Sequence, residues 1–216
     1  MIKPLLRLFS LLQLTKEQPL TGYIIGGLKR HEIPSLADHH YTAALMGWFL
    51  VQEIKDAGGV IDERRVVLML LIHDLPELFG GDISTPLNRK YPDLRAYKNK
   101  IGERAMQLLS DIIGGSSKKQ LEQLWDELDQ GKTDAAIVVK IIDQMDHQFF
   151  LEHYNYTKKN DTQAIYFRSS VVHNHVYALT ARIKNEKTKD VVDAFLKEFH
   201  TTYFNQGYQG MKILME

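Results

Sequence analysis

Four side chains of types that bind metal ions stand where a folded chain would bury them. His73 and Asp74 end a long apolar run, and Asp143 follows a second one. His39 stands at the start of a segment whose apolar residues recur at helical spacing. Burying an unpaired carboxylate is costly, so such groups need a partner in the core. One divalent cation can partner all four side chains at once.

The two imidazoles and two carboxylates form a mixed nitrogen and oxygen ligand set. Such a set suits Mn, Co, Fe, Ni or Zn better than Mg or Ca, which prefer oxygen. The residues therefore predict one divalent transition metal as cofactor. Ordinary explanations stay open beside this one. His39 can be a hydrogen-bonded core histidine, the adjacent His-Asp pair can arise by chance, and Asp143 can pair with Lys140 or His147.

The segments that would position these residues read as helices. Ser35 and Asp38 have the spacing of a capping box, which predicts a helix from there to the glycines at 58 and 59. Asp62 can cap the next helix, whose apolar run predicts a central helix buried on all sides. A strand is the competing interpretation of that run. Thr133 can cap the helix that carries Asp143.

The rest of the chain also follows helical spacing, with turn formers between the segments. No internal repeat, low-complexity tract or linker divides it, so residues 1–216 are predicted to form a single all-α domain, a compact helical bundle. The further helices expected are an amphipathic one at 5–12 and those at 101–112, 117–128, 162–183 and 188–203, with a loop at 80–94 and a capping box of Ser117 and Gln120.

Composition excludes several classes of protein. Lys+Arg and Asp+Glu both number 27, which argues against a strongly basic nucleic-acid binder. The chain has no cysteine, so disulfides, zinc–thiolate sites and cysteine nucleophiles are excluded. Arg7 interrupts the N-terminal apolar run, and no stretch approaches the roughly 20 apolar residues of a membrane span. The expectation is a cytoplasmic protein with no membrane partner.

The order His, His-Asp, Asp resembles the HD-domain metal-dependent phosphohydrolases. The middle block is similar to the His-Asp-x-x-Glu and Gly-Asp-x-x-Thr-Pro motifs of that superfamily's 5'-deoxynucleotidase-like branch. The resemblance covers about residues 21–156 and implies a helical bundle on which the C-terminal helices pack. The segments that carry it are residues 36–40 (LADHH), 72–77 (IHDLPE), 81–86 (GDISTP), 125–127 (WDE) and 139–143 (VKIID), with Lys132, Thr133 and Ala136.

The resemblance implies roles for individual residues. His39, His73, Asp74 and Asp143 would hold the metal. It further implies that Glu77 and Asp82 are active-site carboxylates that do not bind the ion, and that Thr85 contacts the substrate. Independently of the family, Glu77 stands one helical turn after His73, so both can face one pocket.

The activity implied is release of phosphate from (deoxy)nucleoside 5'-monophosphates, a small-molecule phosphate ester. A metal-activated water would attack phosphorus, with Glu77 as general base or proton shuttle. Asp82 and Thr85 would hydrogen-bond the sugar. Two alternatives use the same site: a phosphodiesterase or nucleotide pyrophosphate hydrolase, and a sensor of nucleotide or metal that does not turn over.

One segment departs from the branch. Its members usually carry an Arg-Thr-Gly-aromatic segment before the first ligand, and here Leu20 stands where the phosphate-orienting arginine is expected. Lys29 or Arg30 could replace that cation, or could be solvated surface charge. The branch commonly forms dimers, which is the basis for expecting a homodimer. His40 is expected at the edge of the pocket or in solvent.

Overall fold

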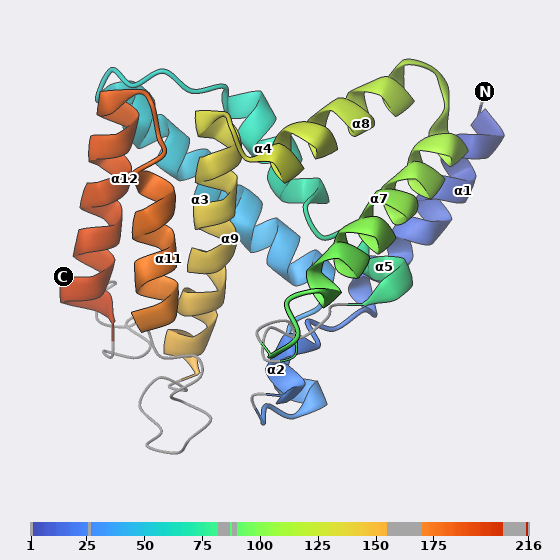
Figure 1. The fold of residues 1–216 in the computed structure, drawn as a ribbon, viewed down its shortest axis with the longest axis horizontal. Coiled ribbons are helices and arrows are strands. Elements are labelled where there is room, and N and C mark those ends of the chain that lie inside the picture. The colour runs from blue at the N-terminus through green and yellow to red at the C-terminus, as the bar shows by residue number, and fades with distance from the viewer. Residues whose placement is uncertain are drawn as a thin grey trace. The chain divides into compact units, whose positions relative to one another are not determined.

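The computed structural model describes residues 2–25, 27–81, 87, 90–154, 170–204 and 215. Within these residues the secondary structure is helical and contains no strand (Figure 1). Pro19 and Ser35 form an isolated antiparallel bridge, which brings the chain back before the helix that starts at Leu36. The all-α fold class is therefore confirmed, and the strand interpretation of the apolar run before His73 is wrong.

The chain divides into two compact units, each made of separate stretches of sequence. The first unit comprises Met1–Thr42 and Leu71–Gln130, and the second comprises Ala43–Leu70 and Gly131–Glu216. Two helices, α3 (Leu36–Asp56) and α4 (Glu63–Ile72), contribute residues to both units. The expectation that residues 1–216 form one domain stays a prediction.

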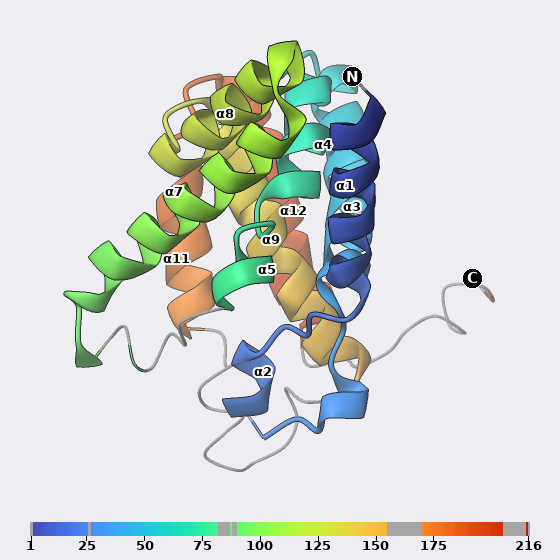
Figure 2. The same ribbon diagram turned by 90° about the vertical axis from the view of Figure 1, so that its right-hand side faces the viewer.

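In the first unit, α7 packs against α1, α5 and α8, and Figure 2 shows α7 and α8 joined by a short connection. Its apolar centre is formed by Leu75, Met106 and Leu109, with partly buried side chains such as Trp125 around them. Besides the first residues of α3, the elements are α1 (Ile2–Leu12), η1 (Gln13–Lys16), α2 (Gly22–Ile25), η2 (Arg30–Glu32), α5 (Glu77–Gly80), α7 (Leu94–Ile113) and α8 (Gly115–Gln130).

In the second unit, α9 (Asp134–His153), α11 (Ser170–Thr180) and α12 (Glu186–Glu198) lie side by side (Figure 1). A π-helical turn, η4 (Phe199–Tyr203), follows α12. The ring of Phe199 meets Phe149 of α9 edge to face, with centroids 4.9 Å apart. The apolar run of α9 is buried, so this helix is the centre of the unit.

Three predicted caps are confirmed. Before α4, the Asp62 carboxylate oxygen Oδ1 accepts from the Arg65 amide at 3.0 Å. The Ser35 amide and hydroxyl both donate to the Asp38 carboxylate, at 2.9 and 2.7 Å, and the Asp38 amide returns a 3.2 Å bond to the Ser35 hydroxyl. At the start of α9, the Thr133 hydroxyl oxygen accepts from the Ala136 amide at 3.1 Å. Each cap satisfies amides that have no partner inside the helix, and so fixes where the helix begins.

Several predicted boundaries are wrong. The helix expected at 101–112 begins at Leu94. Leu94 and Tyr97 continue the apolar spacing of Ile101, and the expected boundary left them out. α8 begins at Gly115, so Ser117 lies inside that helix and does not cap it. The last helix is capped by Asn185, whose side chain accepts from the Thr188 amide at 2.9 Å. Residues 162–169 of the expected helix at 162–183 lie outside the described residues.

The apolar run of α4 is less buried than its composition predicts. Val66, Met69 and Leu70 are buried, but Leu71 is 42% exposed. A helix that is apolar all round can still present one side to solvent when its neighbours cover only the other sides. Within the described part of the chain, no helix combines the length and apolar content needed to cross a bilayer.

Candidate metal centre

Three of the four predicted ligands converge in the first unit. The Nε2 atoms of His39 and His73 lie 2.9 Å apart. The Asp74 carboxylate oxygen Oδ2 lies 3.4 Å from the His73 Nε2 and 3.8 Å from the His39 Nε2. His39 and His73 are 34 positions apart in the sequence. Even so, their Nε2 atoms and the Oδ2 atom of Asp74 point toward one place.

Local structure explains why these side chains are there. The capping box at Ser35 starts α3, so that His39 stands in its first turn, and His39 is 1% exposed. α4 ends at Ile72 and is followed by turns, in which the Leu75 amide bonds the Ile72 carbonyl at 3.1 Å. Pro76 has no amide hydrogen and cannot continue the helical ladder. His73 and Asp74 are consequently held in a tight connection between α4 and α5.

The spacing of the three atoms fits a divalent cation. Two ligand atoms that are each about 2.1 Å from one ion lie roughly 3.0–3.4 Å apart when they occupy adjacent coordination positions. The distances of 2.9 and 3.4 Å match this range, and 3.8 Å corresponds to a somewhat wider angle. The imidazoles are buried while Asp74 is only half-buried, so the cluster is open on the carboxylate side. An open side is what a catalytic site needs, because water or substrate must reach the ion.

A third imidazole packs against this cluster. His40 is buried, with its ring centroid 4.9 Å from that of His73 and 6.0 Å from that of His39. Of the two positions expected for His40, the one in solvent is therefore wrong. Its ring limits how the His73 ring can turn, which helps to hold the His73 nitrogen in place.

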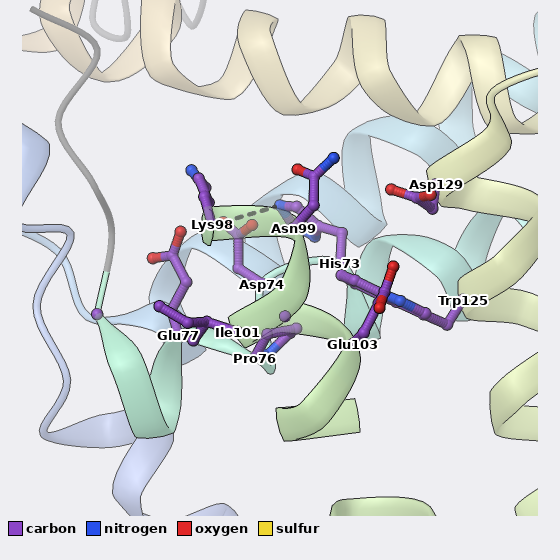
Figure 3. A pocket seen from close by; sticks show the side chains of 12 residues that line it. His73, Asp74, Pro76, Glu77, Lys98, Asn99, Ile101, Glu103, Trp125 and Asp129 are labelled. Atoms are coloured by element: carbon purple, nitrogen blue, oxygen red, sulfur yellow. Dashed lines mark ion pairs between the residues drawn. The ribbon is translucent and has the colours of Figure 1, made fainter. Parts of the chain in front are cut away.

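A pocket of about 210 Å³ in the first unit is lined by His73 and Asp74 (Figure 3). Glu77 lines the same pocket, so the expectation that His73 and Glu77 share a pocket is confirmed. The remaining lining residues are Pro76, Gly81, Lys98, Asn99, Ile101, Gly102, Glu103, Trp125 and Asp129. The cluster thus borders a space large enough to admit a small molecule.

The polar lining that α7 and α8 contribute was not predicted from the sequence. Lys98, Asn99 and Glu103 belong to α7, and Asp129 to α8. The first two of these precede residue 101, where the helix was expected to begin. Residues 98, 99 and 102 share one helical face, and that spacing would have been the signal had the helix been extended to Leu94.

Asp143, the fourth predicted ligand, belongs to the second unit, where it stands on α9. Its Oδ1 lies 3.4 Å from the His147 Nε2, and its Oδ2 accepts from the Gln144 side chain at 3.1 Å. The pairing with His147 that the sequence left open is thus present. A carboxylate can keep such a neighbour while another lone pair binds an ion. The place of Asp143 in the ligand set stays a prediction.

Of the other predicted catalytic and substrate-binding residues, two lie outside the described residues and two do not line this pocket. Asp82 and Thr85 lie outside the described residues. The Arg30 guanidinium donates to the Glu17 carbonyl at 2.9 Å, and the Lys29 amide donates to the Glu32 carboxylate at 2.9 Å. Both residues are exposed, and neither lines the pocket described above. Their role in binding substrate stays a prediction.

An all-helical fold with a His/Asp cluster suited to a divalent ion defines the HD class of metal-dependent phosphohydrolases. The chain belongs to the HD-domain family, whose profile matches residues 14–192. Among curated relatives it is 30% identical, over 156 residues, to the 5'-deoxynucleotidase HDDC2 of Dictyostelium discoideum, covering 71% of this chain and 78% of that protein. The human protein of the same name is 30% identical over 142 residues, 66% of this chain and 64% of its own length.

Solved structures share the fold at lower identity. A conserved hypothetical protein from Pyrococcus furiosus superposes with a TM-score of 0.68 at 22% identity, over 90% of this chain and 98% of that one. A protein from Pyrococcus horikoshii gives 0.63 at 20% identity, over 92% and 97%. The match with the human relative spans slightly under two thirds of that protein, so the activity that its name states is a hypothesis for this chain.

Proposed function

We propose that this chain is a metal-dependent phosphomonoesterase that releases phosphate from (deoxy)nucleoside 5'-monophosphates. The observation that supports this most strongly is the opening of the His39, His73 and Asp74 cluster into a pocket that also holds Glu77. A site that only stabilised the fold would need neither an accessible pocket nor a further carboxylate beside its ligands. The relatives are named 5'-deoxynucleotidases, which supports the substrate class that we propose.

His39, His73, Asp74 and Asp143 are proposed to hold one ion of Mn, Co, Fe, Ni or Zn. Asp143 enters the set because the family profile covers residues 14–192, so the match includes the segment that carries it. When bound, such an ion supplies Lewis-acid activation of water and of a phosphoryl oxygen. Because Asp74 is only half-buried, a substrate could reach the ion from the side of Asp74.

Glu77 is proposed to move the proton. Its carboxylate stands on the pocket wall beside Asp74, where one oxygen can accept a proton from the attacking water (Figure 3). The same carboxyl group can then return that proton to the leaving sugar oxygen. Asp82 is proposed as the second active-site carboxylate, and with Thr85 it would hydrogen-bond the sugar. Both stand on the segment that follows α5.

One observation favours a second candidate, a phosphodiesterase or nucleotide pyrophosphate hydrolase. Leu20 stands where the branch usually has the arginine that orients a monoester phosphate. A site that lacks this cation could accept a substrate carrying less charge at phosphorus. A panel of nucleoside 5'-monophosphates, 3'-monophosphates, cyclic nucleotides and polyphosphates separates the two candidates by which members release product.

The test combines metal analysis with phosphate release. The chain is stripped with a chelator, reloaded with Mn, Co or Zn, and assayed on the panel beside Asp74→Asn, which keeps the shape of the side chain and removes its charge. We expect stoichiometric metal in the parent. In the variant we expect metal affinity to fall by more than about 100-fold, since loss of mere supporting groups already costs about 10–100-fold.

Asp56→Asn is the matched control, because Asp56 is an exposed residue at the end of α3. It should leave both metal content and rate unchanged. An Asp74→Asn protein that keeps its metal and its rate would contradict the proposed site. Tight metal binding with no turnover of any panel member would instead identify a sensor.

A further inference from the structure

We propose that Lys98 binds the substrate phosphate in the pocket of the first unit. This inference rests on the proposed function, because it assumes that a phosphate ester occupies that pocket. Its physical basis is the charge of the lining. Among the described lining residues, Lys98 is the single lysine or arginine, whereas Asp74, Glu77, Glu103 and Asp129 are all acidic.

A phosphate monoester cannot approach so many carboxylates without a compensating cation. Two unit charges about 4 Å apart near a protein surface interact by roughly 4 kcal/mol, and a monoester carries close to two negative charges at neutral pH. Lys98 is half-buried, whereas the neighbouring Lys100 is exposed. A lysine ammonium also supplies three donors to phosphate oxygens.

The backbone of α7 brings Lys98 to the pocket. Gly102 lies one turn after Lys98 and is buried against Trp125 and Pro76. A Cβ atom at this position would lie 3.6 Å from the Trp125 ring and 3.9 Å from the Pro76 side chain. This close approach turns the face made by residues 98, 99 and 102 toward the lining. The neighbouring Lys100 points about 200° away around the helix and is exposed.

The lining is also asymmetric, which orients the ester. Figure 3 shows Lys98 on the same side of the pocket as Asp74 and Glu77, while Glu103, Trp125 and Asp129 lie on the other side. The phosphate would therefore sit between Lys98 and Asp74. The uncharged part of the substrate would face Glu103 and Asp129, whose carboxylates accept hydrogen bonds from sugar hydroxyls.

The experiment compares Lys98→Met, which keeps the chain length without the charge, with Lys98→Arg and with Lys100→Met as control. Four quantities are measured on metal-loaded protein: the KM for a nucleoside monophosphate, the inhibition constant for inorganic phosphate, the affinity for inorganic phosphate by phosphorus NMR titration, and the metal content. In Lys98→Met we expect the affinity for phosphate to fall and the KM to rise, each by about 10–100-fold, which is the usual contribution of a charge-assisted hydrogen bond. The metal content should be unchanged.

Lys98→Arg should stay within about 10-fold of the parent because it keeps the charge. Lys100→Met should match the parent in all four quantities. Unchanged phosphate affinity in Lys98→Met would overturn the assignment, and so would a loss of metal, which would make Lys98 a support of the metal site. If no panel substrate releases phosphate, the proposed function fails, while the NMR titration still decides whether Lys98 binds phosphate.

Discussion

Helices α7 and α9 have the same length, 20 residues each, and opposite relations to their units. α9, in the second unit, buries eleven of its residues, including the run from Ala135 to Val139. α7, in the first unit, buries five, and these lie on one side of the helix. A helix covered all round serves as a packing centre. α7 lines the pocket with the side that carries its buried residues, one turn before the first of them, because Lys98 and Asn99 share the face of Gly102 and Glu103 lies at its edge.

The contrast between α7 and α9 shows where charged side chains can be placed at a small cost in folding free energy. Charged groups are expensive to bury, so a pocket needs a helix whose polar side chains reach a partly open space. The packed second unit can supply stability instead, because large apolar side chains in contact contribute most of the free energy of folding. We therefore expect three effects on the free energy of unfolding, and we give the largest first.

The largest effect is expected in the packing centre. Ile141 is fully buried on α9, so Ile141→Ala should lower the free energy of unfolding by about 2–5 kcal/mol through lost apolar contact and a residual cavity. Leu108→Ala on α7 is the control, since Leu108 is 48% exposed and should cost less than about 1 kcal/mol. Urea unfolding followed by circular dichroism measures both. Equal losses would mean that α9 is not the packing centre.

A smaller effect is expected from a polar contact of the second unit. Both carboxylate oxygens of Asp134 accept backbone amides at 2.9 Å, one from Lys184 and the other from Asn185, in the connection between α11 and α12. Asp134→Ala should cost about 1–3 kcal/mol because it leaves these two donors without their acceptor. The exposed neighbour Lys132 provides the control, as Lys132→Ala. Faster hydrogen exchange at the amides of 184 and 185 is expected only in the Asp134 variant.

The smallest effects should have opposite signs at two buried helical glycines. A Cβ at Gly47 on α3 would lie 2.2 Å from the Leu70 side chain, which is itself buried. A Cβ at Gly102 on α7 meets nothing nearer than 3.6 Å. Alanine gains up to about 1 kcal/mol of helix propensity over glycine at either site. At Gly47 overpacking of about 1–3 kcal/mol outweighs that gain.

We therefore expect Gly47→Ala to destabilise the protein by about 1 kcal/mol and Gly102→Ala to stabilise it by up to about 1 kcal/mol. Differential scanning calorimetry of the two variants measures the signs directly. Because Gly102 lines the pocket, its variant should also narrow the space beside Lys98 and raise the KM. Stabilisation by Gly47→Ala would show that α3 and α4 pack less closely than this structure indicates.

Some features were predictable because their cause is local. A capping box needs only residues three positions apart, so the start of α3 at Leu36 followed from Ser35 and Asp38. The Thr133 cap of α9 followed in the same way. The first two turns of α7 were not predicted, although Leu94 and Tyr97 continue the spacing of Ile101, because the turn formers at 80–94 indicated a loop through Leu94. That omission hid Lys98, which lay between the loop expected at 80–94 and the helix expected at 101–112.

Other features depend on neighbours that the sequence does not name. The exposure of Leu71 on α4 and the burial of His40 on α3 both contradict what residue type alone suggests. Burial is decided by which element covers a face, and the spacing of residues within one element carries no information about that.

By itself the sequence determined the helical class, the helix starts that have side-chain caps, and the identity of the residues able to bind a metal, because each depends on residue type and short-range spacing. The three-dimensional packing was needed to show that His39, from α3, meets His73 and Asp74 within ligand distance. It was also needed to show that Lys98 lines the same pocket as His73 and Asp74. These meetings join residues far apart along the chain. They are fixed by the packing of whole helices, which no local pattern encodes.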